Sequence, residues 1–159
     1  MLKPLRRVDR QTSREDALRV IAESEYGFLA VTGEDGVARA IPMAHVLLGD
    51  CLYFHCARAG QKLDDLARQP RAGYTCVLRA ENVPSAYTTQ YASAMAEGPV
   101  AIVTGEAERQ AAMRALMEKY SAAFLDCPAY DKMMRGMSAV VMLKMQLDTV
   151  CGKANRGKI

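Results

Sequence analysis

Residues 27–56, GFLAVTGEDGVARAIPMAHVLLGDCLYFHC, decide the fold, because two turn signals divide them into three strand-like runs. The first run, residues 27–32, is rich in strand-forming residues, and residues 33–36 (GEDG) carry the turn residues that close a hairpin. Gly49-Asp50 has glycine first, which suits a two-residue type II′ turn, and a third strand follows over residues 51–56. The stretch therefore predicts two consecutive β-hairpins.

The middle strand of these hairpins, residues 37–48, contains Pro42. Proline has no N–H to donate to a sheet, so its position predicts a bulge or an unpaired site inside the strand. A later strand over residues 91–104 contains Gly98-Pro99, where we expect the strand to bend.

Helices and further strands flank the hairpins. Thr12-Ser13-Arg14-Glu15 is a capping box, in which a hydroxyl accepts from the N3 amide while Glu15 reaches back to the N-cap amide, so a helix should follow and end before Gly27. The remaining pattern predicts helices over 59–68 and 106–120, strands over 72–79, 91–104 and 138–150, and a loop over 81–89.

The expected order contains six strands without a regular alternation of strands and helices. This order favours a mainly β fold, a six-stranded antiparallel barrel that is closed or partly closed and carries peripheral helices. The 159 residues, 50% apolar and 25% charged, match one domain over residues 1–159.

Composition excludes several classes of protein. The longest apolar stretches fall far short of the roughly 20 residues that cross a bilayer, so we expect no membrane association. The basic N-terminus leads into Asp9 and Arg10 rather than an apolar segment, so we expect no secretory signal and a cytoplasmic location. Five cysteines at irregular spacings, without a C-x-x-C pair, indicate reduced thiols rather than disulfides or a zinc ribbon.

The chain has two histidines, His45 and His55. If Gly49-Asp50 is a two-residue turn, His55 lies opposite Ala44, and strand alternation sends the His45 side chain to the other face. The histidines then cannot share a metal, whereas a slip of one residue would place them on one face. We expect no metal site, and any chemistry must come from few residues or from a bound cofactor.

Basic residues concentrate at the two ends of the chain. Residues 1–14 hold five Lys and Arg, and residues 152–159 hold three. Such ends can contact nucleic acid, but no aromatic residues are interleaved with them, so we expect solvated termini and no nucleic-acid partner.

The segment 53–62, YFHCARAGQK, has the features of a phosphate site. A strand ends, a turn with Gly60 follows, and a helix begins close to Lys62. Free amides, the positive end of the helix dipole and an ammonium group then meet in one place. The segment is not a Walker loop, because the G-x-x-x-x-G-K-[ST] spacing is absent.

Several short motifs recur along the chain in the order and spacing of a known family. They are Arg6–Gln11 (RRVDRQ), Ile41–His45 (IPMAH), Tyr53–His55 with Gly60 and Lys62, Tyr91–Ser93 with Gly98, and Gly152–Ala154. With these motifs the chain resembles the flavin-binding split-barrel superfamily of pyridoxamine 5′-phosphate oxidase, and within it is most similar to the nitroimidazole-resistance (Nim) group.

The resemblance implies an FMN held in the groove between the two subunits of a homodimer. The implied cofactor contacts are Pro42, Met43, Ala44 and His45 along the isoalloxazine, His55 and Cys56 near the ribityl chain and phosphate, Gln61 and Lys62 on the phosphate, and Ser93 with Tyr91 reaching over from the partner subunit. In similar Nim proteins the histidine at the position of His55 is linked to substrate chemistry, so His55 is the implied catalytic residue. The alternative is a partly buried histidine that only shapes the pocket.

The chain also departs from the family pattern. Gln61 stands where a further cation is common, and Cys56 stands where a small hydroxyl residue or glycine is usual. A thiol at Cys56 near a helix start is either redox-active or simply a small buried side chain. The sequence has no Trp, and its end lacks the Arg-rich, Trp-containing segment with which pyridoxamine phosphate oxidases hold their substrate, so that oxidase activity is not expected.

Two functions remain open from the sequence. The first is an FMN-dependent oxidoreductase that reduces a small molecule such as a nitro compound. The second is a non-catalytic module of the same fold that binds flavin or haem.

Overall fold

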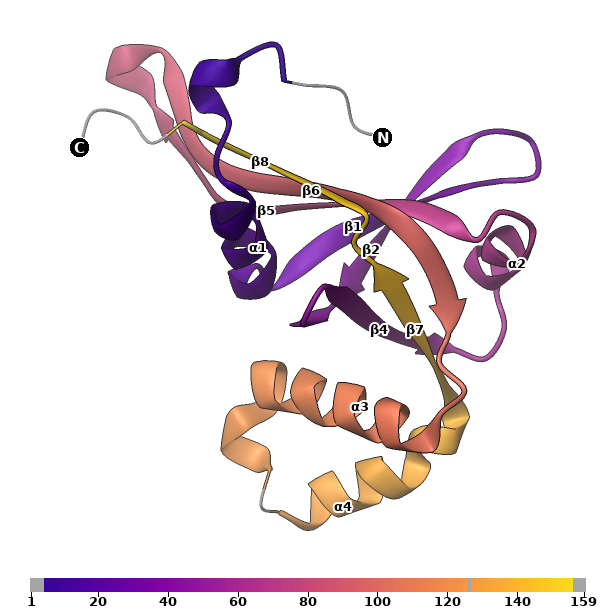
Figure 1. Ribbon diagram of the computed structural model, residues 1–159. Coiled ribbons are helices and arrows are strands. Elements are labelled where there is room, and N and C mark those ends of the chain that lie inside the picture. Colours follow the sequence, from indigo (N-terminus) through magenta and orange to yellow (C-terminus); the bar gives the residue numbers. More distant parts are fainter. Residues whose placement is uncertain (1–4, 126, 156–159) are drawn as a thin grey trace.

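The computed structural model describes residues 5–125 and 127–155, which are built around one curled antiparallel sheet (Figure 1). Its strands are β1 (Tyr26–Thr32), β2 (Ala38–Ala44), β3 (Val46–Leu48), β4 (Cys51–Ala57), β5 (Arg71–Val83), β6 (Thr88–Ile102), β7 (Val140–Gln146) and β8 (Thr149–Asn155). They follow the order β2-β1-β5-β6-β7-β4-β3, and β8 also pairs with β6. Lys3, Arg156 and Lys158 of the basic ends lie outside the described residues.

The long strand β6 curls the sheet, because it changes partner along its length. Its first half pairs with β8 as far as Glu97, and its last residues pair with β7 from Val100 onward. Gly98 and Pro99 lie at the change, where Figure 1 shows β6 curving away from β8 toward β7. A Cβ on Gly98 would lie 1.7 Å from the backbone oxygen of Gln146, so only glycine lets the two strands approach here.

Helices lie around this sheet. They are α1 (Arg14–Glu23), α2 (Gln61–Arg68), α3 (Glu106–Ser121) and α4 (Pro128–Arg135), with 3₁₀ turns at Val8–Arg10, Pro84–Ala86, Ala122–Phe124 and Gly136–Ala139. In Figure 1, α3 and α4 form a helical lobe at the end of the molecule opposite the tip of the β5–β6 hairpin. No helix within the described residues has the length and apolar character needed to span a membrane.

The predicted class, mainly β with antiparallel strands and peripheral helices, is confirmed, but the described residues form eight strands rather than six. The expected strand 37–48 breaks at His45 and not at Pro42, which pairs with Phe28 in an unbroken register. Strand β2 lies at the edge of the sheet, where a missing donor is tolerated. At this break the His45 N–H donates to the Tyr120 hydroxyl at 3.0 Å instead of to a strand, and that hydroxyl shares its own proton between the carbonyl oxygens of Glu25 at 2.6 Å and His45 at 2.9 Å.

Three other boundaries differ from the sequence prediction. The strand expected over 138–150 divides after Gln146, where the Leu147 N–H bonds to Asp50 and the Asp148 N–H to Glu97. Most residues of the expected loop 81–89 belong instead to the β5–β6 hairpin, whose last pair before the turn is Val83↔Thr88. The cap of α1 is Ser13, whose Oγ accepts from the Asp16 N–H at 3.0 Å, rather than the Thr12 of the expected capping box.

The two hairpin turns agree with the prediction. Leu48 pairs with Cys51 and Val46 with Tyr53, as the two-residue turn requires. Gly49 has a positive φ of 58° and Asp50 does not, which is the type II′ pattern. Tyr53 therefore lies opposite Val46 and Phe54 opposite the position of His45, the register that separates the two histidines.

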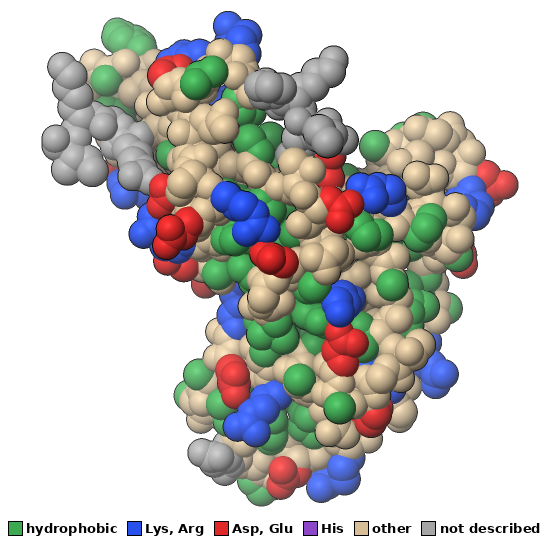
Figure 2. All heavy atoms as spheres, in the orientation of Figure 1, with side chains coloured by type: hydrophobic (Ala, Val, Ile, Leu, Met, Phe, Trp, Pro, Cys, Tyr) green, Lys and Arg blue, Asp and Glu red, His purple; other side chains and the backbone are tan. Residues whose placement is uncertain are grey.

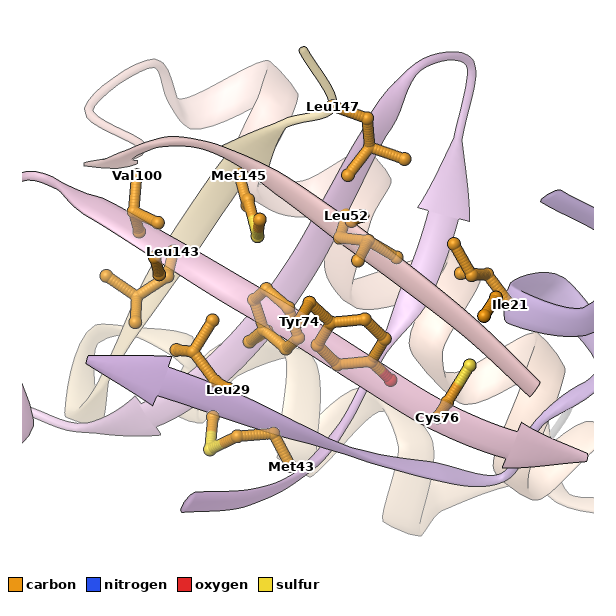
Figure 3. Close-up of a cluster of buried hydrophobic side chains, with 14 of the residues drawn as sticks. Ile21, Leu29, Met43, Leu52, Tyr74, Cys76, Val100, Leu143, Met145 and Leu147 are labelled. Atoms are coloured by element: carbon orange, nitrogen blue, oxygen red, sulfur yellow. The ribbon is translucent and has the colours of Figure 1, made fainter. Parts of the chain in front are cut away.

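The buried side chains form two clusters. The larger lies inside the sheet and under α1, with Tyr74 at its centre and Ile21, Leu29, Leu52 and Met145 around it (Figure 3). The smaller joins α3 to the sheet through Leu116, Met113, Val46, Tyr53 and Met142. The helical lobe is thus attached to β3, β4 and β7 by an apolar contact of its own.

Candidate cofactor site

The loop between β4 and α2 presents unpaired backbone amides. Gly60 precedes α2 with φ 140° and ψ 159°, and its C=O accepts from the N–H groups of Leu63 and Asp64. The amides of Gln61 and Lys62 lie in the first turn, which has no intrahelical acceptor, and no side chain caps this end. An anion placed here would meet free N–H groups and the positive end of the helix dipole.

Lys62 brings three of the other expected residues together. Its Nζ donates to the Met43 sulfur at 3.4 Å, which ties α2 to β2. Its positive charge also lowers the pKa of His55 and of Cys56, both on β4. Met43, His55, Cys56 and Lys62 therefore form one cluster, which we call the Lys62 cluster.

His55 is the exposed member of the Lys62 cluster. It pairs with Met142 of β7 and lies on the face of β4 opposite to the buried Phe54 and Cys56. Partial burial of the ring lowers its pKa, and the Lys62 ammonium lowers it further. The imidazole is therefore neutral at pH 7, able to donate at one ring nitrogen and accept at the other.

Cys56 is buried, and burial raises the pKa of its thiol above the ordinary value although the Lys62 charge opposes the shift. A protonated, buried thiol is a poor nucleophile. The structure thus favours the small buried side chain over the redox-active thiolate.

Gln61 has a basic neighbour that the sequence did not reveal. With its amide oxygen facing β2, Gln61 accepts from Arg39 Nε at 3.1 Å and Nη2 at 3.3 Å. Arg39 is itself held by both carboxylate oxygens of Asp35 in the β1–β2 turn. A guanidinium therefore lies beside the position where the family pattern has a cation, and no local sequence signal indicates it.

The His45 side chain lies in the core. Its Nε2 is 2.6 Å from the Ile21 carbonyl oxygen, which can only accept, so Nε2 carries the proton and Nδ1 accepts from the Tyr74 hydroxyl at 2.7 Å. Lys119 Nζ is 3.3 Å from Nε2 and donates to the Ser24 carbonyl at 2.7 Å. Burial lowers the pKa of His45 to about 4, with Lys119 adding to the shift.

The other expected ring contacts divide between two faces of β2. The Met43 side chain points into the core (Figure 3), whereas Pro42 is exposed and Ala44 is half-buried. The backbone N–H and C=O of His45 both bond to Tyr120. Of the four residues expected along the isoalloxazine, His45 therefore has its backbone groups bonded to Tyr120, whereas Pro42, Met43 and Ala44 do not.

Tyr91 and Ser93 lie in a different region of the chain. Ser93 Oγ donates to the Lys153 carbonyl at 3.3 Å, and Lys153 Nζ lies 5.8 Å from the centre of the Tyr91 ring. Burial raises the pKa of Tyr91, but hydrogen bonds from Arg10 and Lys153 outweigh it and leave the pKa below its ordinary value.

One chain does not bring this pair to the Lys62 cluster. Met43 of that cluster pairs with Gly27, Gly27 pairs with Cys76, and Cys76 pairs with Ala94, the residue after Ser93. Three strand spacings, roughly 14 Å, therefore separate this part of β6 from Met43 across the sheet.

The outer face of β1, β5 and β6 is apolar. Phe28 is 46% exposed and Val77 54% exposed, and Phe28, Thr75 and Met95 lie side by side in register. With Ala40 and its neighbours they line a shallow hollow of about 220 Å³. Exposed apolar surface of this kind is typical of an interaction site.

No group of three or more His, Cys, Asp or Glu side chains in the described ranges could hold a metal ion. Acidic and basic side chains are interspersed on the face shown in Figure 2, without a continuous basic surface.

Replacing Gly60 by Ala is expected to lower the free energy of unfolding by about 1–2 kcal/mol, because a side chain rarely adopts φ 140°. No atom lies within 4 Å of the added Cβ, so the cost comes from the backbone alone. Urea unfolding measures it, with Gly136→Ala as the matched control, since Gly136 is equally open but has φ −82°. Equal stability of the two variants would contradict the strained conformation.

Comparison with solved structures gives the same fold. A candidate 5-nitroimidazole antibiotic resistance protein from Bacteroides thetaiotaomicron aligns with a TM-score of 0.77 and 22% identity, over 89% of this chain and 84% of that one. A FAD-binding protein from Mesorhizobium loti aligns at 0.68 and 16% identity, over 92% and 97%. The FAD and heme binding protein from Mycobacterium smegmatis aligns at 0.72 and 19% identity, over 93% and 74%.

The comparison with curated proteins gives no match. The family model described as pyridoxamine 5′-phosphate oxidase matches residues 13–154. This span runs from α1 through β8 and leaves out only the last residue of β8. This chain belongs to the pyridoxamine 5′-phosphate oxidase family.

Proposed function

We propose that this protein binds FMN and acts as an FMN-dependent oxidoreductase that reduces a small molecule such as a nitro compound. The observation that carries the proposal is the N-terminus of α2, where the free amides of Gln61 and Lys62 and the Lys62 ammonium meet beside β2 and His55. A phosphate dianion fits this donor set. The structural relatives that bind flavin support the same cofactor class.

The residues have distinct roles in this proposal. Lys62, Gln61 and the first amides of α2 bind the phosphate, with Cys56 packed beneath. Pro42, Met43 and Ala44 present an edge-strand backbone along the isoalloxazine, and His45 fixes the end of that strand from inside the core. When bound, the flavin supplies the electron or hydride transfer, and the chain supplies position and proton access.

His55 is proposed as the proton-carrying side chain near the cofactor. It is exposed, belongs to the Lys62 cluster and is neutral at pH 7 because its pKa is lowered. A neutral imidazole can accept a proton at one nitrogen and release one from the other, which suits a relay between solvent and substrate.

We propose further that two copies of the chain form the cofactor site. The apolar outer face of β1, β5 and β6 is suited to pack against a second copy of the chain. Across the sheet of one chain, β6 near Ser93 is three strands away from Met43, so in this proposal Tyr91 and Ser93 contact the cofactor from the partner subunit.

Flavin reconstitution tests the proposal. Protein purified without added flavin, incubated with FMN and then desalted, is expected to retain flavin absorbance in proportion to subunit concentration. Protein that emerges colourless would sink the proposed cofactor. Anaerobic assays with reduced nicotinamide donors and a nitroaromatic acceptor are then expected to show acceptor-dependent oxidation.

A non-catalytic flavin- or haem-binding module is the second candidate. It is favoured by the relative that binds both FAD and heme and by the neutral, exposed imidazole of His55, a side chain able to ligate iron. The absorbance spectrum after purification distinguishes haem from flavin. Bound cofactor without acceptor-dependent oxidation would select this candidate over the oxidoreductase.

A further inference from the structure

The segment ahead of α1 brings a cation to β6 and β8. The 3₁₀ turn Val8–Arg10 lies against β8 (Figure 1), and the residue that follows it forms an isolated bridge with Lys153. Lys153 pairs with Ser93, and because side chains alternate along a strand, Tyr91 and Ser93 share one face of the sheet with Lys153. Lys153 Nζ lies 5.8 Å from the centre of the Tyr91 ring. Arg10, Tyr91 and Lys153 thus meet at one place, which we call the Tyr91 cluster.

The Tyr91 cluster carries positive charge without a matching carboxylate. Burial raises the pKa of Tyr91, but hydrogen bonds from the Arg10 guanidinium and the Lys153 ammonium outweigh it, so both cations face one phenol oxygen. Neither cation forms an ion pair with a carboxylate among residues 5–125 and 127–155, and both carboxylate oxygens of the adjacent Asp9 bond to Arg7. Two half-buried like charges lie close together here, and a bound oxyanion would offset their repulsion.

The donors of the Tyr91 cluster define the chemistry of its ligand. A guanidinium presents a fork of N–H groups that matches a planar carboxylate, and an ammonium adds a point charge. The same charges repel a cation, and a neutral molecule gains little from them. The half-buried Tyr91 ring adds an aromatic surface on which another ring can stack. These features together favour a small aromatic carboxylate.

In the proposed function the cofactor phosphate is bound at Lys62, whereas Tyr91 and Ser93 reach the cofactor from the partner subunit. The charges of Arg10 and Lys153 are therefore not needed for the phosphate. We propose that Arg10 and Lys153 bind the carboxylate of the small molecule that is reduced, an aromatic acid whose ring packs against Tyr91. That this acid is the electron acceptor rests on the proposed function, whereas its binding to the Tyr91 cluster does not.

Isothermal titration with para-nitrobenzoate and para-nitrobenzamide tests this inference, because the two probes share a ring and a nitro group and differ in charge. The protein is expected to bind the carboxylate about tenfold more tightly than the amide. Arg10→Gln and Lys153→Gln are each expected to remove most of that difference and to leave the affinity for the amide unchanged. Lys132→Gln, which removes an exposed lysine of α4, is the matched control and is expected to bind both probes as the wild-type protein does.

The Tyr91 phenol gives a second readout, which needs no substitution of either cation. In protein with ring-labelled tyrosine, NMR follows the titration of each phenol, and Tyr91→Phe identifies the signal of Tyr91. The two cations lower the pKa of Tyr91 against the effect of burial, because they favour the phenolate. A bound carboxylate offsets their charge, so saturation with para-nitrobenzoate is expected to raise the pKa of Tyr91, and para-nitrobenzamide is not. A pKa of Tyr91 that the carboxylate leaves unchanged would contradict binding at the Tyr91 cluster.

The outcomes separate this inference from the proposed function. Equal affinity of the wild-type protein for the two probes, or an equal loss of both in Arg10→Gln and Lys153→Gln, would overturn the anion site even where FMN is retained. A loss of FMN affinity in these variants as large as that in Lys62→Ala would show that the two cations serve the cofactor and would also overturn it. Preferential binding of the carboxylate by protein that retains no flavin would support the anion site and overturn the proposed function.

Discussion

Acidification from pH 6.5 to pH 4 is expected to reduce the free energy of unfolding by about 3 kcal/mol through His45 alone. In the unfolded chain His45 takes up its proton near its ordinary pKa of 6.5, whereas burial holds its pKa in the folded protein near 4. Between these values the unfolded state binds more protons than the folded state. The contribution of His45 to the free energy of unfolding is therefore complete above pH 6.5 and is lost as the pH falls toward 4.

The contacts of His45 explain why protonation of its ring is unfavourable in the folded state. Nδ1 must accept from the Tyr74 hydroxyl, Nε2 already donates to Ile21, and Lys119 brings a positive charge to 3.3 Å from the ring. A second ring proton, on Nδ1, would face the hydroxyl hydrogen of Tyr74 inside the core. The protonated ring would also be repelled by Lys119.

Urea unfolding at a series of pH values measures the effect. His45→Gln is expected to flatten the profile between pH 6.5 and 4, whereas His55→Gln is expected to keep most of the slope, since His55 is the only other histidine and is exposed. Titration of the wild-type imidazole by NMR gives an independent reading, because the His45 ring should stay neutral to about pH 4. A His45 ring that titrates at its ordinary pKa would contradict the interpretation.

Replacing Lys62 by Ala is expected to weaken FMN binding roughly 10- to 100-fold, because one charge-assisted contact to a phosphate is lost. Riboflavin lacks the phosphate, so its affinity should not change in the same variant. Lys62→Arg keeps the charge and is expected to recover most of the FMN affinity.

Isothermal titration of the apoproteins measures these affinities. Lys132→Ala serves as the control, because Lys132 is an exposed lysine on α4, far along the chain from the α2 N-terminus. Unchanged FMN affinity in Lys62→Ala would remove Lys62 from the site. An equal loss for riboflavin and FMN would show that the substitution disturbs the Met43 contact rather than a phosphate contact.

Local sequence signals predicted the elements that depend on neighbouring residues. The Gly49-Asp50 turn fixes the register Leu48↔Cys51, because glycine readily adopts the positive φ of its first position. Gly60 and Lys62 similarly identify the start of α2. The register then separates His45 from His55, as expected without any knowledge of the rest of the chain.

Long-range contacts decided what local signals missed. The break at His45 depends on Tyr120, 75 residues later, and the division of the last expected strand depends on backbone acceptors at Asp50 and Glu97. Pro42 was a misleading signal, because a proline interrupts a ladder only where its missing N–H has a strand to pair with.

The sequence by itself determined the antiparallel hairpins, the helices α1, α2 and α3 and the glycine-led start of α2 beside Lys62, since each depends on turn, cap and periodicity rules over a few residues. Only the tertiary structure placed His45 in the core, Arg39 beside Gln61, and the Asp65 carboxylate in a buried position where Arg68 pairs with it. Burial and charge proximity set those properties, and both arise between segments that are distant in the chain, where no local pattern records them.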